Sequence, residues 1–246
     1  MGTLREKNLQ KEYFNTHQTE EFVYGQNIPY ARYMVGKILE HIQKKSNRVL
    51  EIGAGQGRFT FELARHIPHV VAIDIAERAI TILKQEIKQR KLYSVSAVAC
   101  DVLEIEKILP KGQFNAIVGI HILHHLPKDK LSSVIRQLKK FLAPGGYFCF
   151  LEPNSLYPFY LVAMLVQPNM TWEYEKGIYT NFLGVFKRAC EAQGLRVTGI
   201  RKFGFFPPKI INRWPWITKA GSVIEHIPLI RDILCPFVVI AARKSL

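Results

Sequence analysis

Short apolar runs alternate with longer stretches whose apolar positions recur at helical spacing, and this alternation continues from residue 48 to the end of the chain. The runs that predict buried strands are 49–52, 70–74, 95–100, 114–119, 147–151, 195–202 and 237–243. The stretches that predict helices are 30–44, 59–67, 77–91, 130–141 and 179–193. Strands that alternate with helices in this way predict an α/β fold with a mostly parallel sheet.

The first predicted strand ends in a loop that places glycine at every second position, Gly53, Gly55 and Gly57. Because glycine has no Cβ, the backbone there can adopt positive φ and let a flat polar ligand lie against it, beside the amide groups that open the next helix. A dinucleotide site would need a third small residue where Arg58 stands. The spacing therefore disfavours a dinucleotide.

Two further predicted strands end at a carboxylate, since Asp74 is the last residue of the second strand and Asp101 follows the third. In a parallel sheet the carboxyl ends of the strands line the ligand crevice, so Asp74 would project towards whatever the glycine loop holds. Its carboxylate can accept two hydrogen bonds from a ribose diol. The alternatives are local: Asp74 would cap the helix that starts near Glu77, and Asp101 would be an ordinary loop residue.

Three histidines follow the fourth predicted strand, His121, His124 and His125. We do not expect a metal site, because no paired carboxylate accompanies them and their spacing in a loop is not a zinc signature. His124 or His125 would instead close the turn with ring hydrogen bonds. His121 lies nearer the strand end, so it is the better candidate to face a substrate.

Residues 48–152 resemble the class I S-adenosylmethionine-dependent methyltransferases. The features that carry the resemblance are the E-x-G-x-G-x-G segment from Glu51 to Gly57, the two strand-end carboxylates, the L-H-H-L run at 123–126 and the L-x-P-G-G turn at 142–146. The resemblance implies S-adenosyl-L-methionine as the cofactor. It also implies a doubly wound, mostly parallel sheet of seven strands in the order 3-2-1-4-5-7-6, with helices on both faces.

The resemblance also implies which residues hold the cofactor. Asp74 would bind its ribose, Asp101 would accept a hydrogen bond from the adenine amino group, and Val102 would pack against the adenine ring. An oxygen acceptor that must lose a proton would use His121 or Glu152, at the ends of adjacent strands, as the base, whereas a nitrogen acceptor with a free lone pair would need neither. The expected cofactor-binding residues are Glu51, Gly53, Ala54, Gly55, Gly57, Asp74, Ile75, Asp101, Val102 and Gly119.

Two stretches exceed the minimal fold, at about 153–178 and about 203–236, and both are rich in apolar and aromatic residues. We expect them to be substrate lids on a methyltransferase domain of residues 47–246, with residues 1–46 as an N-terminal helical cap. The apolar core of the first lid is about eleven residues long, short of the roughly twenty that cross a bilayer. The lids would pack on the domain, form a pocket for a lipophilic acceptor, or rest in a membrane interface.

The chain is basic: its 246 residues carry a formal net charge of +14, from 34 Lys and Arg against 20 Asp and Glu. This balance favours an anionic partner, either nucleic acid or an acidic membrane surface, although a basic soluble enzyme would show it too. The 4 cysteines are dispersed and suggest neither a disulfide framework nor a zinc site. Because the N-terminal residues lack an apolar signal core, we expect a cytoplasmic protein, with peripheral contact to an anionic membrane as a further hypothesis.

The favoured interpretation is a methyltransferase that acts on oxygen or nitrogen of a small, lipophilic or aromatic acceptor. The principal alternative is an RNA methyltransferase, since the chain is basic. However, residues 119–122 lack the N/D-P-P-Y-like sequence of base-amino enzymes, and neither a Pro-Cys nucleophile nor a separate RNA-binding module is evident. A second alternative is a catalytically silent cofactor-binding subunit that supports a partner.

Overall fold

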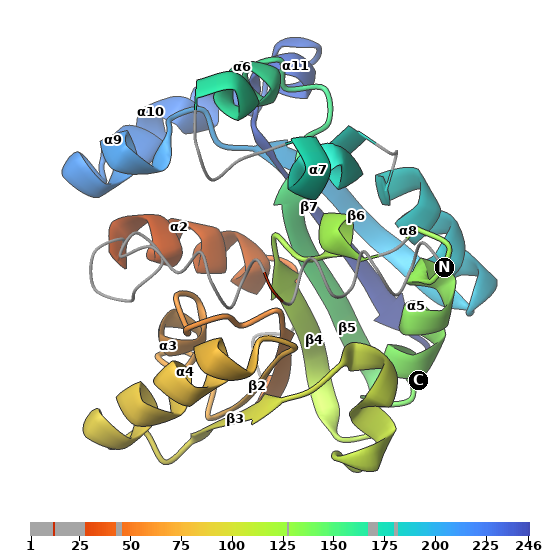
Figure 1. Ribbon diagram of the computed structural model, residues 1–246. Coiled ribbons are helices and arrows are strands. Elements are labelled where there is room, and N and C mark those ends of the chain that lie inside the picture. The colour runs from red at the N-terminus through yellow and green to blue at the C-terminus, as the bar shows by residue number, and fades with distance from the viewer. Residues whose placement is uncertain (1–11, 13–27, 43–45, 127, 167–171, 180–181) are drawn as a thin grey trace.

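The computed structural model describes residues 12, 28–42, 46–126, 128–166, 172–179 and 182–246. Within these residues, seven strands form one sheet in the order β3-β2-β1-β4-β5-β7-β6, which confirms the predicted order (Figure 1). The strands are β1 Arg48–Ile52, β2 His69–Asp74, β3 Val95–Ala99, β4 Phe114–Ile120, β5 Leu142–Pro153, β6 Leu195–Phe203 and β7 Phe237–Lys244.

The centre of the sheet is parallel, and one side of it is antiparallel. Strand β1 pairs in parallel with β2 and β4, so that Ile52 lies beside Ile73 on one side and Gly119 on the other. Strand β7 lies between β5 and β6 and runs antiparallel to both. The carboxyl ends of β1, β2 and β4 therefore meet at one edge of the sheet.

Helices cover both faces of this sheet (Figure 1). Successive side chains of a strand point to opposite faces. In β4, Ala116 and Val118 pack in a cluster with α2, whereas Ile117 packs in a cluster with α5 and α8. Because both faces are covered, the central strands read as continuous apolar runs. The covering helices are α2 Ile28–Leu39, α3 Thr60–Leu63 and α4 Glu77–Gln89 on one face, and η2 Val102–Lys107, α5 Leu131–Lys139 and α8 Phe182–Ala192 on the other.

Three elements differ in extent from the predictions. The helix predicted over 59–67 is only the single turn α3, and α2 ends at Leu39, while residues 43–45 lie outside the described part of the chain. The segment with Pro144 was predicted as a turn before the fifth strand. It is instead a bulge within β5, since Leu142 pairs with Phe114 and Tyr147 already pairs with Ala116. The extra residues include Gly145, whose φ is 72°.

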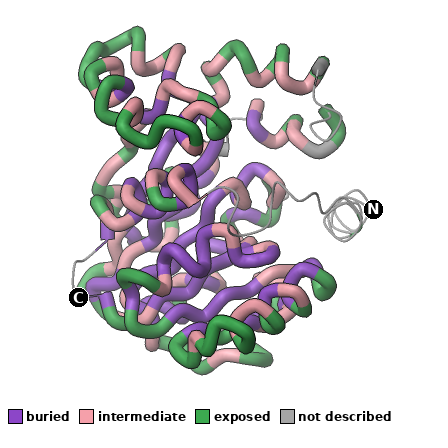
Figure 2. The backbone as a smooth tube through the Cα atoms, turned by 90° about the vertical axis from the view of Figure 1, so that its left-hand side faces the viewer, coloured by how far each residue is buried: buried purple, intermediate pink, exposed green. Residues whose placement is uncertain are grey.

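The two predicted lids lie at the same end of the molecule, beyond the carboxyl ends of the parallel strands (Figure 1). This end is mostly exposed or half-buried, whereas the sheet is buried (Figure 2). The division into cap, domain and lids remains our proposal, and most of the cap lies outside the described residues. The lid helices are α6 Phe159–Val166, α7 Trp172–Glu175 and the 3-10 helix η4 Lys176–Tyr179, then α9 Pro208–Arg213, α10 Ile217–Ile224 and α11 Ile230–Leu234.

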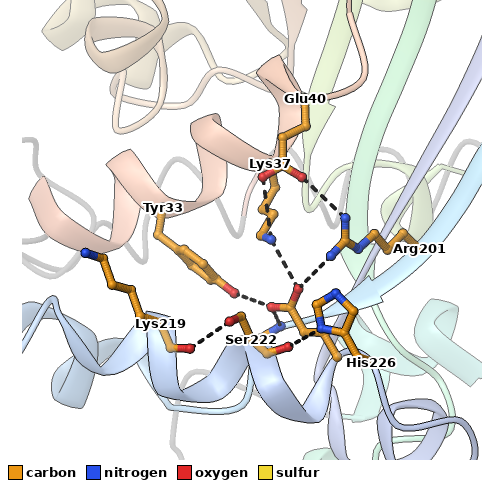
Figure 3. Close-up of polar contacts among 9 residues, drawn as sticks. Tyr33, Lys37, Glu40, Arg201, Lys219, Ser222 and His226 are labelled. Carbon is orange, nitrogen blue, oxygen red and sulfur yellow. Dashed lines mark hydrogen bonds and ion pairs between the residues drawn. The ribbon is translucent and has the colours of Figure 1, made fainter.

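A buried carboxylate fastens the second lid to the rest of the fold. Glu225, which follows α10, has a fully buried side chain. It accepts hydrogen bonds from Tyr33 Oη at 3.0 Å, Lys37 Nζ at 3.2 Å, Arg201 Nη2 at 3.3 Å and the backbone N–H of Gly204 at 3.2 Å. Figure 3 shows Tyr33 and Lys37 reaching from α2, and Arg201 from β6, towards α10. Helix α10 is therefore held by charge as well as by packing.

We expect Glu225→Gln to lower the free energy of unfolding by about 3 kcal/mol, because the amide removes the nearest negative charge from the buried Lys37 ammonium. Urea denaturation at neutral pH measures the change. The matched control is Glu104→Gln, which breaks an exposed pair with Lys107 and should change stability little, since exposed pairs contribute little. Equal midpoints for the two variants would contradict the role of Glu225.

Candidate functional site

The glycine loop leaves β1 with three left-handed residues. Gly53, Gly55 and Gly57 have φ values of 71°, 53° and 96°. The loop is also tied to the neighbouring strand, because the N–H groups of Gly53 and Ala54 both donate to the carbonyl oxygen of Ile73, at 2.9 and 3.1 Å. Its backbone is therefore fixed at the edge where the parallel strands end.

The three glycines are needed for different reasons. A Cβ on Gly53 would lie 2.7 Å from the side chain of Ile122, and one on Gly57 would lie 2.5 Å from Leu83 of α4, so both positions are small because of packing. A Cβ on Gly55 would have no atom within 4 Å. Of these glycines, Gly55 is thus the one that faces open space, where a ligand can lie against the backbone.

Asp74, at the end of β2, lies beside the open space at Gly55. Its Oδ2 accepts from the N–H of Gly55 at 2.7 Å and its Oδ1 from the N–H of Ala76 at 2.8 Å, across the peptide of Ile75. Burial raises the pKa of Asp74, and these backbone hydrogen bonds oppose the rise. The N-cap of α4 is Ala76, with no side-chain capping bond. Asp74 therefore braces the glycine loop rather than capping α4 directly.

Asp101 lies on the adjoining strand end, since the N–H of Cys100 donates to the carbonyl oxygen of Asp74 at 2.8 Å. Its Oδ1 accepts from the N–H of Leu103 at 2.9 Å, which makes it the N-cap of η2. Val102 is half-buried and packs against the core on that face. A capping role for Asp101 is thus present in the structure, beside the adenine-binding role that the resemblance implies.

Glu51 and Gly119 lie inside the sheet edge rather than on its surface. Glu51 is 2% exposed and accepts from Thr60 Oγ1 at 2.6 Å, which fastens α3 to β1. Burial raises the pKa of Glu51 to about 7, while the Thr60 hydrogen bond opposes the rise. A Cβ on Gly119 would lie 2.6 Å from Ile122, so Gly119 leaves room for that side chain. Both residues therefore stabilise the structure around the glycine loop, Glu51 by a hydrogen bond and Gly119 by packing.

His121 lies just beyond β4 in a left-handed conformation, with φ 57°. Such a conformation is unfavourable for a residue with a Cβ and often marks a functional position. Its Nε2 is 3.5 Å from Tyr30 Oη, and its ring packs 5.5 Å from that of Phe237, measured between centroids. Burial lowers the pKa of His121 to about 4, so the imidazole is neutral at pH 7 and can accept a proton.

Both carboxylate oxygens of Glu152 have hydrogen-bond partners within the protein. Its Oε1 accepts from the N–H groups of Ile122 and Leu123, at 3.0 and 2.8 Å, and its Oε2 is 2.6 Å from His124 Nδ1. The residue is fully buried. This geometry does not support its expected role as a base, because both carboxylate oxygens already hold the turn after β4. His124 has the turn-closing contact that was one of the interpretations of the sequence.

Sequence reasoning missed two residues that the fold brings to this site. Tyr30 comes from α2 and reaches His121, although it precedes that residue by 91 positions. Glu175 comes from the first lid and places Oε2 3.4 Å from His124 Nε2. The sequence offers one weak signal for it, since Glu173 and Glu175 follow a long stretch without charged side chains.

The sequence is similar to a known protein family and to several methyltransferases. Residues 49–146 match the family described as a methyltransferase domain. Phosphoethanolamine N-methyltransferase 1 of Zea mays is 30% identical over 105 residues, 42% of this chain and 20% of that protein. The chain thus spans about a fifth of the length of that relative. Ubiquinone biosynthesis O-methyltransferase of Coxiella burnetii is 26% identical over 181 residues, 70% of this chain and 73% of that protein.

Solved structures share the whole fold at low sequence identity. A SAM dependent methyltransferase from Archaeoglobus fulgidus aligns with a TM-score of 0.62 and 19% identity, over 97% of this chain and 99% of that one. Geranyl diphosphate C-methyltransferase from Streptomyces coelicolor aligns with a TM-score of 0.63 and 13% identity, over 98% of both chains. With the strand order, they show that the chain has the seven-stranded fold of the class I S-adenosylmethionine-dependent methyltransferases, and residues 49–146 within it form a methyltransferase domain.

Proposed function

We propose that the protein transfers the methyl group of S-adenosyl-L-methionine to oxygen or nitrogen of a small, lipophilic acceptor. The observation that carries the proposal is the open space at Gly55, bounded by Asp74 at the end of the neighbouring strand. Similarity to an O-methyltransferase and to N-methyltransferases supports these two acceptor atoms. The cofactor supplies an electrophilic methyl group, which the acceptor attacks in line.

The cofactor would lie between the glycine loop and the ends of β2 and β3. The N–H groups of Gly55, Ile75 and Ala76 donate to the Asp74 carboxylate, whose two oxygens offer about four acceptor positions, so a position would remain for a ribose hydroxyl. Gly53, Ala54 and Gly55 would provide the backbone surface against which the cofactor rests. Ile75, Asp101 and Val102, on the adjoining strand ends, would bound its adenine, while Glu51, Gly57 and Gly119 would hold the loop in shape.

The acceptor would approach from the side of His121. This half-buried, neutral imidazole can take a proton from an acceptor hydroxyl. A weak base suffices, because the attacking oxygen becomes strongly acidic as its new bond to carbon forms. Tyr30, 3.5 Å from the ring, would orient it, and Glu152 would position the turn without taking the proton. For an amine acceptor with a free lone pair, His121 would only shape the pocket.

The apolar lids support a lipophilic acceptor. Helix α6 contains only apolar and aromatic residues, and four of its side chains are half or more exposed. Among the described residues, no helix combines the length and apolar character needed to span a bilayer. The exposed side chains of α6 are Phe159, Leu161, Val162 and Leu165.

We further propose that this lid end rests on an anionic membrane surface. Trp214 and Trp216 of the second lid are 49% and 65% exposed, and exposed Lys209, Arg213 and Lys219 lie beside them in the chain. Aromatic rings suit the boundary between headgroups and acyl chains, and basic side chains suit anionic headgroups. The arrangement would give the enzyme access to an acceptor dissolved in the membrane.

Replacement of Gly55 tests the cofactor site. Gly55→Leu should abolish S-adenosyl-L-methionine binding in calorimetry, because its side chain would fill the open space. The matched control is Gly112→Leu, at an exposed turn where φ is 70° and no atom lies within 4 Å of the new Cβ. Both variants bear a similar backbone strain of roughly 1 kcal/mol. Unchanged affinity in Gly55→Leu would contradict the site.

Replacement of His121 tests the base. For a phenolic acceptor, His121→Asn should lower kcat by about a hundredfold or more while cofactor affinity is retained, because asparagine tolerates positive φ but is not a base. Since the pKa of His121 is about 4, the wild-type rate should not titrate with this group between pH 6 and 8 and should fall only as the pH approaches 4. His69→Asn, at an exposed position on the opposite edge of the sheet, serves as the control. Equal kcat values in the two variants would rule out His121 as the base.

Flotation with liposomes tests the membrane surface. Wild-type protein should float with vesicles that contain phosphatidylglycerol and less with pure phosphatidylcholine. The double variant Leu165→Glu and Trp216→Glu should lose this binding, because it places negative charge on the apolar surface. Tyr93→Glu changes a side chain that is 91% exposed outside the lids and should bind as the wild type does. Failure of the wild type to float with the anionic vesicles would remove this proposal and leave the cofactor site unaffected.

A further inference from the structure

A cluster of nitrogen and oxygen donors lies where the first lid meets the end of β4. It consists of His124 and His125, in the 3-10 helix η3 Leu123–His125, and Glu175, the last residue of α7. One ligand atom from each of the three lies within 4.8 Å of the others. The cofactor site and the proposed base use none of them.

The spacing within the cluster fits a tetrahedral metal ion. His124 Nε2 and Glu175 Oε2 are 3.4 Å apart. Two ligands that each lie about 2.1 Å from one tetrahedral zinc ion are separated by about 3.4 Å, so this pair has the separation that a shared ion requires. The rings of His124 and His125 lie 3.9 Å apart between centroids, which brings a second imidazole to the same place.

The second nitrogen of His124 has the partner that metal-binding histidines typically use. Glu152 Oε2 lies 2.6 Å from His124 Nδ1, and a carboxylate can only accept there, so Nδ1 carries the proton. Glu152 is itself held by the N–H groups of Ile122 and Leu123. A carboxylate that fixes the tautomer in this way directs the Nε2 lone pair of a histidine to a metal. Here Nε2 faces Glu175.

The charges agree with a divalent cation. Glu152 and Glu175 together supply two negative charges around His124, whose side chain is 2% exposed. Although burial lowers it, hydrogen bonds to Glu152 and Glu175 raise the pKa of His124 to about 9, so a divalent ion would take the place of the proton on Nε2 between these two carboxylates. Two imidazoles and a carboxylate suit Zn²⁺ better than Mg²⁺ or Ca²⁺, which prefer oxygen ligands only. His125 and Glu175 are only partly buried, so the cluster has a path to solvent.

We propose that His124, His125 and Glu175 form a Zn²⁺-binding site that clamps the first lid onto the turn after β4. Two ligands come from η3 and the third from α7, about fifty residues further along the chain, so that metal binding would join the two segments. The site was not expected from the sequence, because its carboxylate is distant from the histidines.

Titration of the full-length protein tests the site directly. Protein stripped with EDTA and dialysed should bind one Zn²⁺ per chain in competition with a chromophoric chelator. Glu175→Gln should weaken binding by about tenfold or more, since it removes a charged ligand. Glu173→Gln is the matched control, because it removes an exposed carboxylate from the same short helix. Circular dichroism verifies that both variants are folded.

A second measurement identifies the ligands. Co²⁺ in place of Zn²⁺ should show the visible bands of a tetrahedral site without the near-ultraviolet band of a thiolate ligand, and His125→Asn should abolish these bands. No binding by the wild type at micromolar Zn²⁺, equal affinities for Glu175→Gln and Glu173→Gln, or a thiolate band would each overturn the proposal. These readouts do not depend on methyl transfer, so they stand or fall separately from the proposed function.

Discussion

The register of β1 between β2 and β4 is the constraint on which the ligand-binding edge depends. It sets Ile52 beside both Ile73 and Gly119, so the glycine loop, the Asp74 carboxylate and the turn with His121 all begin at one level of the sheet. Hydrogen bonds from Gly53 and Ala54 to Ile73 continue this pairing one step past the strand. A slip of one residue would send every side chain to the opposite face and separate the loop from its carboxylate.

A single side chain links the two halves of the site. Ile122 occupies the space that a Cβ would fill at both Gly53 and Gly119, so the glycine loop and the turn after β4 both pack against this side chain. The same turn is also held by Glu152, which accepts hydrogen bonds from two of its backbone N–H groups. The glycine loop and the His121 imidazole are therefore fixed relative to each other by packing and by hydrogen bonds to backbone groups.

Much of the fold could be predicted from the sequence, because buried parallel strands are continuous apolar runs and the glycines and carboxylates follow them directly. The strand order came from the family resemblance, since periodicity alone does not determine it. The bulge at Pro144 was not predicted, because a helix-ending turn and a widened strand both use proline and glycine. Within the site, Gly55 and Asp74 adjoin as expected.

Other parts of the site depend on contacts between distant segments. Tyr30 and Glu175 reach the turn after β4 from α2 and from the first lid, and their local sequence gives no signal for Tyr30 and only a weak one for Glu175. Glu152 follows the pattern of a strand-end carboxylate, yet two backbone N–H groups of the neighbouring turn donate to its Oε1, and the His124 side chain is paired with its Oε2. The left-handed backbone at His121 is equally invisible in sequence, since glycine or asparagine would normally indicate such a conformation.

The hydrogen bonds and ion pairs of Glu225 attach the second lid to the rest of the fold differently from the first lid. The second lid cannot swing away without exposing a desolvated carboxylate and separating it from Lys37 and Arg201. The first lid is attached near its start by hydrogen bonds from Asn154 and Tyr160 to the segment before β7, and further along by Glu175 at His124. In the proposed function, the acceptor would therefore enter and the methylated product would leave on the side of the first lid, while the second lid would stay in place.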